Sequence, residues 1–227
     1  MPKNTEPHQS LVDKAYEKIR SDLTCGELKP GQKIIFQDLV KRYEISETPI
    51  KQALNRMVVE GLVESIPRKG MRIKPISIQD FNEIMDIRYM LESYFAPIIM
   101  EAVSYHPEFL DELEANIKKQ YRAIEIGTTE LNDFLEIYSV DHAFHHILLR
   151  CANHKRALQV YEMIGAHSFS YFLYNKKPKS KLIAGVQEHE LILNALKDQD
   201  LAALQAAIST HAAGARISIN YTLGIEP

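Results

Sequence analysis

The strongest constraint on the fold is a helical pattern that runs from residue 77 almost to the end of the chain. Apolar residues recur there every three or four positions, which is the spacing of one face of an α-helix. Capping and turn residues divide the region into six expected helices, at residues 77–104, 107–126, 129–151, 153–175, 180–198 and 199–222. No segment of this region has the alternating pattern of a strand. The sequence therefore predicts a mainly α protein whose larger part is an all-helical bundle of about six helices.

The first 75 residues follow a different pattern, with three short helices before a hairpin. Two helices are expected at residues 10–25 and 36–43, and Ser46 is placed to cap a third. Residues 64–74 alternate in polarity and turn at Lys69-Gly70, as a two-stranded wing would. This order predicts a helix-turn-helix unit that is followed by a wing.

Charge is distributed unevenly between these two parts. Residues 1–75 hold 14 Lys/Arg and 10 Asp/Glu, a balance of +4, whereas residues 76–227 hold 13 and 20, a balance of −7. A polyanionic partner is therefore expected to bind the first part. We predict one domain at residues 1–75 and a second domain at residues 76–227.

The sequence has no pattern typical of secretion or of a membrane span. The N-terminus lacks the apolar core of a signal peptide, and no run approaches the roughly 18 apolar residues of a spanning helix. Only Cys25 and Cys151 occur, too few and too far apart for a disulfide framework. A cytoplasmic protein without membrane contact is expected.

The third N-terminal helix carries polar side chains that can reach phosphates or base edges. They are Thr48, Lys51, Gln52, Asn55 and Arg56. Such a face suits the major groove of double-stranded DNA, and basic residues at the wing tip would touch a neighbouring groove. The alternative is that these charges form an ordinary solvated face of a small helical domain.

Three histidines and one aspartate lie on the apolar stripes of three different C-terminal helices. They are Asp141, His145, His189 and His211. Burial of an ionised carboxylate without a partner costs several kcal/mol, and a bound cation with three imidazoles would offset that cost. His142 and His146 have the same spacing as the first pair but lie toward the edge of the stripe. We therefore predict a divalent metal site, with zinc as the first choice and nickel or manganese as alternatives. The alternative for each histidine is a hydrogen-bonded core residue.

Four short motifs stand out between Ala15 and Lys74. They are Leu28-Lys-Pro-Gly-Gln, Ile45-Ser-Glu-Thr-Pro-Ile-Lys-Gln-Ala-Leu, Glu60-Gly-Leu-Val and Arg68-Lys-Gly. With these motifs the segment resembles the winged helix-turn-helix of GntR-type bacterial regulators. The resemblance implies that operator DNA is contacted by Ser46, Thr48, Lys51 and Arg56, by Arg68, Lys69 and Gly70 at the wing, and by Gln37 near the DNA backbone. Two positions depart from the family pattern: Glu47 and Lys51 each stand where the family usually has an arginine.

The C-terminal part, residues 77–222, has motifs of its own. They are Arg88-Tyr-Met-Leu-Glu, Asp141-x-x-Phe-His, Cys-Ala-Asn153, Glu188-His189, and His211 placed 22 residues after His189. They resemble the helical ligand-binding (FCD) domain of the FadR-like branch of GntR regulators, in its metal-dependent version. The resemblance implies that all four metal positions are filled and that Arg88 pairs with the carboxylate of an effector. The alternative role of Arg88 is an ion pair with Glu92 or Asp141.

Together these features predict a homodimeric, metal-containing transcription regulator, and the habit of the family suggests a repressor. A small organic acid would bind at the metal and change the affinity for operator DNA. Two other functions stay open: a purely structural metal in a dimerisation module, and a metal-dependent enzyme. The enzyme is disfavoured because Glu188, the carboxylate next to His189, points about 100° away from it on a helix.

Overall fold

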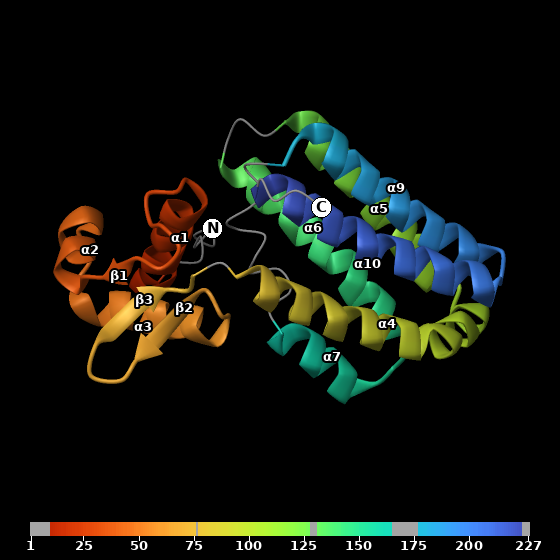
Figure 1. Cartoon of the computed structure of the whole chain (residues 1–227), viewed down its shortest axis with the longest axis horizontal. Coiled ribbons are helices and arrows are strands. Elements are labelled where there is room, and N and C mark those ends of the chain that lie inside the picture. Colours follow the sequence, from red (N-terminus) through yellow and green to blue (C-terminus); the bar gives the residue numbers. More distant parts are fainter. Residues whose placement is uncertain (1–9, 76, 128–130, 165–176, 224–227) are drawn as a thin grey trace, which may run out of the picture. The chain divides into compact units, whose positions relative to one another are not determined.

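The computed structural model describes residues 10–75, 77–127, 131–164 and 177–223. The chain divides into two compact units, Met1–Ile76 and Ser77–Pro227. Figure 1 shows a small unit with a short sheet and a larger unit made of helices. The predicted fold class, a winged helix-turn-helix followed by an all-helical bundle, is confirmed.

The N-terminal unit consists of three helices and a three-stranded sheet. Its elements are α1 (Leu11–Thr24), β1 (Lys33–Ile34), α2 (Phe36–Tyr43), α3 (Glu47–Val59), β2 (Val63–Ile66) and β3 (Gly70–Ile73). The strands are antiparallel in the order β1-β3-β2, so that Arg72 of β3 pairs with Lys33 on one side and Glu64 on the other. β1 was not predicted, because two residues are too short to show a strand period.

Local sequence explains how these elements begin and end. The Ser10 side chain caps α1 by accepting a hydrogen bond of 3.1 Å from the backbone amide of Asp13. Ser46 occupies the capping position of α3, as predicted, but its side chain makes no hydrogen bond to the helix.

The wing turns one to two residues earlier than predicted: Lys69 N donates to Ile66 O at 3.0 Å, and Arg68 has a φ of 62°. Pro67 with a left-handed residue after it fits a type II turn.

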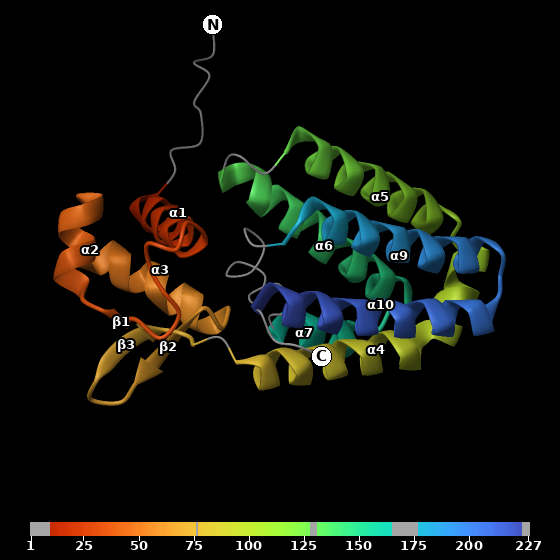
Figure 2. The same cartoon turned by 45° about the horizontal axis from the view of Figure 1, so that its top comes forward.

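The C-terminal unit is helical throughout its described residues (Figure 2). Its six described helices are α4 (Ile78–Tyr105), α5 (Glu108–Ile126), α6 (Leu131–Cys151), α7 (Lys155–Met163), α9 (Lys179–Lys197) and α10 (Leu201–Leu223). The helix predicted at residues 153–175 ends at Met163, just before Gly165 in the sequence, and residues 165–175 lie outside the described part of the chain. The predicted cap of α4 is present, because Ser77 accepts a hydrogen bond from Asp80 N at 3.2 Å.

All six described helices contribute side chains to one core. α9 packs against α5 and α10, while α4 packs against α10 and α6. Apolar side chains fill the space between them, among them Ile99, Leu113, Phe144, Leu148, Ile192, Leu196 and Ile208. Several polar side chains are buried in the same bundle, and they define the site described next. None of the helices in the described part of the chain is long and apolar enough to cross a membrane.

Candidate metal centre and DNA-binding surface

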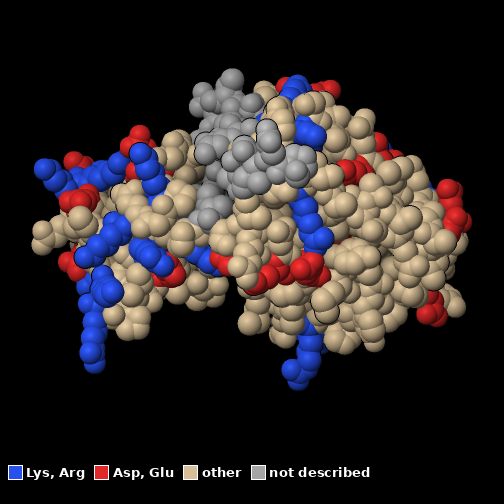
Figure 3. All heavy atoms as spheres, viewed as in Figure 1, with Lys and Arg blue, Asp and Glu red and all other residues tan. Residues whose placement is uncertain are grey.

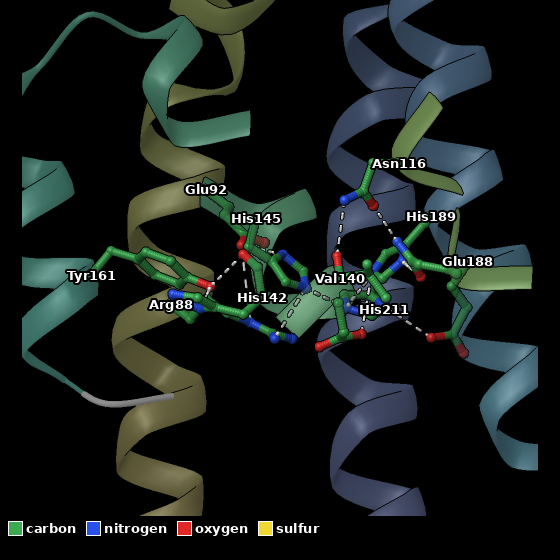
Figure 4. Close-up of polar contacts among 12 residues, drawn as sticks. Arg88, Glu92, Asn116, Val140, His142, His145, Tyr161, Glu188, His189 and His211 are labelled. Carbon is green, nitrogen blue, oxygen red and sulfur yellow. Dashed lines mark hydrogen bonds and ion pairs between the residues drawn. The ribbon is translucent and has the colours of Figure 1, made fainter. Parts of the chain in front are cut away.

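Three buried histidines meet inside the bundle, each from a different helix (Figure 4). His145 lies on α6, His189 on α9 and His211 on α10, and their exposed fractions are 1%, 0% and 5%. Nε2 of His211 lies 3.3 Å from Nε2 of His145 and 3.3 Å from Nε2 of His189. Ligands held about 2.0–2.1 Å from a tetrahedral ion stand about 3.3–3.4 Å apart. The two distances therefore fit imidazoles that share one metal ion.

A chain of hydrogen bonds from α5 fixes the ring of His189. Its Nδ1 donates to Oε1 of Gln120 at 2.9 Å, and Nε2 of Gln120 donates to Oδ1 of Asn116 at 2.7 Å. Asn116 in turn donates to the backbone oxygen of Val140 at 3.0 Å. With its proton held on Nδ1, His189 presents an unprotonated Nε2 to the centre, as a metal ligand must.

Carboxylates lie behind the other two rings. Nδ1 of His211 donates to Oε2 of Glu188 at 2.9 Å. Nδ1 of His145 lies 2.8 Å from Oε1 of Glu92, although the angles are not those of a hydrogen bond. All three histidines thus have an oxygen acceptor near Nδ1 and direct Nε2 toward the other two rings.

Asp141, the fourth predicted ligand, is placed less tightly than the histidines. Its side chain is 33% exposed, and its Oδ1 lies 4.0 Å from Nε2 of His189. The neighbouring histidines, His142 and His146, contact other groups. Nδ1 of His142 lies 2.7 Å from the hydroxyl oxygen of Tyr161, and Nε2 of His146 lies 3.4 Å from Oε1 of Glu162. The structure therefore brings His145, His189 and His211 together, with Asp141 beside them. Their role as ligands is still a prediction.

Burial sets the protonation state of the cluster. It lowers the pKa of His145 well below the usual value, and the charge of Arg88 lowers it further. Burial also lowers the pKa of His189, with a smaller contribution from His211 and His145. For His211 burial lowers the pKa to about 4, although the hydrogen bond with Glu188 acts in the opposite direction. Neutral imidazoles, the form that binds metal, therefore prevail at neutral pH.

A cavity of about 250 Å³ lies beside the cluster, and its lining includes Arg88, Asp141, His145 and His211. Arg88 comes from α4, and only 8% of its side chain is exposed. Its Nη1 lies 3.2 Å from Nε2 of His145, and its Nε lies 3.9 Å from Oε1 of Glu92. Among the described residues, neither Nε nor Nη2 has a hydrogen-bond acceptor. A buried cation with unused donors suits a carboxylate ligand.

Sequence reasoning did not identify the residues behind the histidines. Asn116 and Gln120 lie on one face of α5, four residues apart, but nothing in the sequence places that face against α9. Glu188 was correctly expected to point away from His189, and it contacts His211 instead. Glu92 could have been suspected, because it follows Arg88 by one helical turn on the buried face.

The predicted DNA contacts lie on two exposed parts of the N-terminal unit. Ser46, Thr48 and Lys51 are exposed at the start of α3, and Gln37 is exposed at the start of α2. Nζ of Lys51 lies 2.6 Å from Oε1 of Glu47, so the two departures from the family pattern form an ion pair.

The tip of the hairpin carries the remaining predicted contacts. Arg68, Lys69 and Gly70 are exposed there, and on the face drawn in Figure 3 lysine and arginine side chains gather over this unit. Gly70 has a φ of 92°, which favours glycine.

Arg56, like Lys51, already contacts other side chains of the protein, and its contacts reach two helices. Its Nε lies 3.1 Å from Oε1 of Glu60, and its Nη1 lies 3.7 Å from Oδ1 of Asp13. The guanidinium carbon lies 4.0 Å from the centre of the Tyr16 ring. Arg56 therefore joins α3 to α1, and its contact with DNA is still a prediction.

Comparison with known proteins agrees with both parts of this description. Residues 11–73 match the family described as bacterial regulatory proteins, gntR family, and residues 83–214, more than half of the chain, match the FCD domain. The chain belongs to the GntR family of regulators with an FCD domain. It is therefore a DNA-binding transcription regulator.

Two curated relatives align with most of this GntR-family chain. The HTH-type transcriptional regulator McbR of Escherichia coli (strain K12) is 26% identical over 195 residues, which cover 85% of each chain. The HTH-type transcriptional repressor RspR of the same organism is 25% identical over 211 residues, or 90% of this chain and 87% of RspR. A solved structure of E. coli McbR/YncC aligns with a TM-score of 0.69 and 24% identity, over 95% of this chain and 99% of that one. The structural similarity to McbR/YncC supports the fold described above for this chain.

Proposed function

We propose that this GntR-family regulator is a homodimeric repressor that holds a divalent metal ion at His145, His189, His211 and Asp141. A small organic acid would bind at the metal and Arg88 and change the affinity for operator DNA. Zinc is the first choice of metal, with nickel or manganese as alternatives. The repressor assignment is supported by the relative RspR, which is described as a repressor.

The observation that carries the proposal is the convergence of three Nε2 atoms, two of them on rings whose Nδ1 atoms donate hydrogen bonds, those of His189 and His211. Separations of 3.3 Å between uncharged nitrogen acceptors are unfavourable without a cation or proton between them. A core of hydrogen-bonded histidines would direct donors toward acceptors, but here the Nδ1 protons of His189 and His211 are already used by Gln120 and Glu188. The donor set supports a metal, which would supply positive charge and open coordination positions when bound.

Arg88 supports an acid as the second ligand. The cavity has room for a small molecule, and Nε and Nη2 of Arg88 are buried without an acceptor in the part of the chain that the structure describes. A carboxylate could accept hydrogen bonds from the guanidinium group in a bidentate manner. The two roles that the sequence left open for Arg88 are compatible, because its contact with Glu92 is a distant one of 3.9 Å.

The dimer is supported by an apolar stripe on the outer face of α4. Four side chains at helical spacing are exposed there: Met90 by 65%, Tyr94 by 75%, Ile98 by 43% and Tyr105 by 74%. A second copy would remove this stripe from water and would place two winged units on the two halves of a palindrome.

The experiment that tests the proposal measures ligand and DNA binding in parallel. The zinc-loaded protein is screened by thermal shift against small monocarboxylates, dicarboxylates and sugar acids, since a ligand of the folded state raises its melting temperature. Each acid that raises it is then added to a complex with operator DNA, and the affinity is measured by fluorescence anisotropy. The expected result is at least one acid that changes both quantities, and no longer does so in His189→Ala.

Two results would favour the other functions. If chelator lowers the melting temperature sharply but no acid changes it, the metal is structural and the helical unit serves dimerisation only. If an acid is chemically converted by the zinc-loaded protein, the site is that of an enzyme. The second result is disfavoured because the curated relatives described above are regulators.

A further inference from the structure

Gly214 occupies an unexpected place, in the interior of helix α10. Glycine destabilises a helix interior relative to alanine, and the φ of Gly214 is not in the left-handed region that would require glycine. The explanation is steric. A methyl group at Gly214 would lie 2.9 Å from both the carboxyl carbon and Oε2 of Glu188, and closer still to Oε1. Real side chains do not approach so closely, so alanine cannot coexist with the present position of this carboxylate.

The carboxylate that fills this space is the one that holds His211. Oε2 of Glu188 accepts a hydrogen bond of 2.9 Å from Nδ1 of His211, and Gly214 lies one helical turn after His211 on the same face. The Glu188 side chain is 21% exposed, so it has a route toward solvent if it is pushed away.

We propose that Gly214 and Glu188 form a positioning pair that keeps His211 ready to bind the metal. Because Gly214 has no side chain, the Glu188 carboxylate has room to accept the hydrogen bond from Nδ1 of His211. Nε2 of His211 then stays unprotonated and points toward His145 and His189. The inference rests on the proposed metal site. It adds two residues that would not bind the metal themselves but would orient one of its ligands.

The first variant is Gly214→Ala. It should fold, because alanine favours a helix and the Glu188 carboxylate is the far end of a flexible side chain. The methyl group pushes the carboxylate off His211, whose proton is then no longer confined to Nδ1. Loss of such an outer contact typically lowers metal affinity by about 10–100-fold. Zinc affinity is measured by competition with a chromophoric zinc chelator.

The chain offers a matched control in Gly185, which is interior to α9 and lines the same cavity. A methyl group at Gly185 would meet no atom of the described residues within 4 Å. Gly185→Ala should keep the zinc affinity of the wild type, with an equal or higher melting temperature. A loss of affinity in this control equal to that in Gly214→Ala would overturn the proposal, because alanine in a helix would then be the cause.

A double-mutant cycle separates the carboxylate from other effects of the methyl group. Glu188→Ala should lower zinc affinity by a similar factor, and Gly214→Ala should add nothing to it, because the group that it displaces is gone. Full additivity of the two losses would contradict a shared mechanism.

A metal-free measurement tests the pair independently of the proposed function. In the chelator-treated protein, ¹⁵N NMR of histidine should show His211 protonated on Nδ1, and Gly214→Ala should shift this population toward Nε2. If the wild type binds no zinc, the proposed metal site fails while the tautomer result still decides the role of the pair. If zinc binds the wild type and Gly214→Ala with equal affinity and the tautomer is unchanged, the positioning role is wrong.

Discussion

Replacement of Gln120 by leucine should weaken both the fold and the metal site, but by separable amounts. Glutamine and leucine side chains have similar volumes, so the substitution mainly removes hydrogen bonds and leaves the packing nearly unchanged. Gln120→Leu leaves two buried groups without partners, the Nδ1–H of His189 and Oδ1 of Asn116. Each such group costs about 1–3 kcal/mol, so the unfolding free energy of the metal-free protein should fall by about 2–6 kcal/mol. Urea unfolding in the presence of chelator measures this change.

Zinc affinity should fall for a different reason. Without an acceptor at Gln120, the proton of His189 can move to Nε2, and returning it to Nδ1 must precede metal binding. The expected loss is about 10–100-fold, which corresponds to about 1.4–2.7 kcal/mol. Competition with a chromophoric chelator measures it, and a sample with the same fraction of folded protein is used for each variant.

The double variant Asn116→Leu/Gln120→Leu tells the two effects apart. It removes the unpartnered Oδ1 of Asn116, and the backbone oxygen of Val140 keeps its intrahelical bond within α6. Stability should therefore recover by about 1–3 kcal/mol relative to the single variant, whereas zinc affinity should stay low. Recovery of zinc affinity together with stability, or wild-type affinity in the single variant, would refute the idea that Gln120 orients His189.

Three further outcomes are expected. In the metal-free protein the melting temperature should fall as pH decreases from about 6.5, the unfolded value for histidine, toward the folded pKa of His211, about 4, because the unfolded chain takes up protons first. An equal fall in His211→Gln would contradict this cause. Lys69→Ala should lower the slope of log affinity for operator DNA against log salt by about 0.9, as measured by anisotropy, and an unchanged slope would exclude a phosphate contact. Tyr94→Asp should convert the dimer to monomers in sedimentation, whereas Ile217→Asp, at an exposed residue of α10, should not; a dimer that survives Tyr94→Asp would exclude the α4 stripe.

Periodicity was sufficient to predict most of the fold, because long helices repeat their signal many times. α9 and α10 fall within two residues of their predicted bounds, and α3 begins directly after its predicted cap, Ser46. The failures are short or local. β1 has two residues, which cannot show a period, and the wing turn depends on the φ of one residue, Arg68.

The candidate site divides in the same way. His145, His189 and His211 were found because each interrupts an apolar stripe on its own helix, a feature that one helix shows by itself. Gln120 was missed because its partner, His189, is 69 residues away. A polar residue on an amphipathic helix is ordinary, and only the packing of α5 against α9 makes this one significant. Gly214 was missed for the same reason, since its meaning depends on Glu188 across a helix interface.

The arrangement of the site indicates which helix an acid would act on in the proposed mechanism. α6, α9 and α10 each contribute an imidazole, so a metal would tie these three helices to one another. α4 contributes Arg88 and Glu92, neither of which is a predicted ligand. A metal on Nε2 of His145 would take the lone pair that faces Arg88, so the guanidinium group would be available to an acid.

α4 also begins at Ile78, only five residues after the wing strand β3 ends at Ile73. Within the helical unit, α4 is therefore the helix nearest in sequence to the DNA-binding unit. An acid that changes the position of α4 would act on this helix. Coupling of this kind typically amounts to about 1–3 kcal/mol, which needs an acid that prefers one arrangement of α4 by about 5–150-fold. One charge-assisted pair with Arg88, made in one arrangement and lost in the other, falls in that range, at about 1.5–3 kcal/mol.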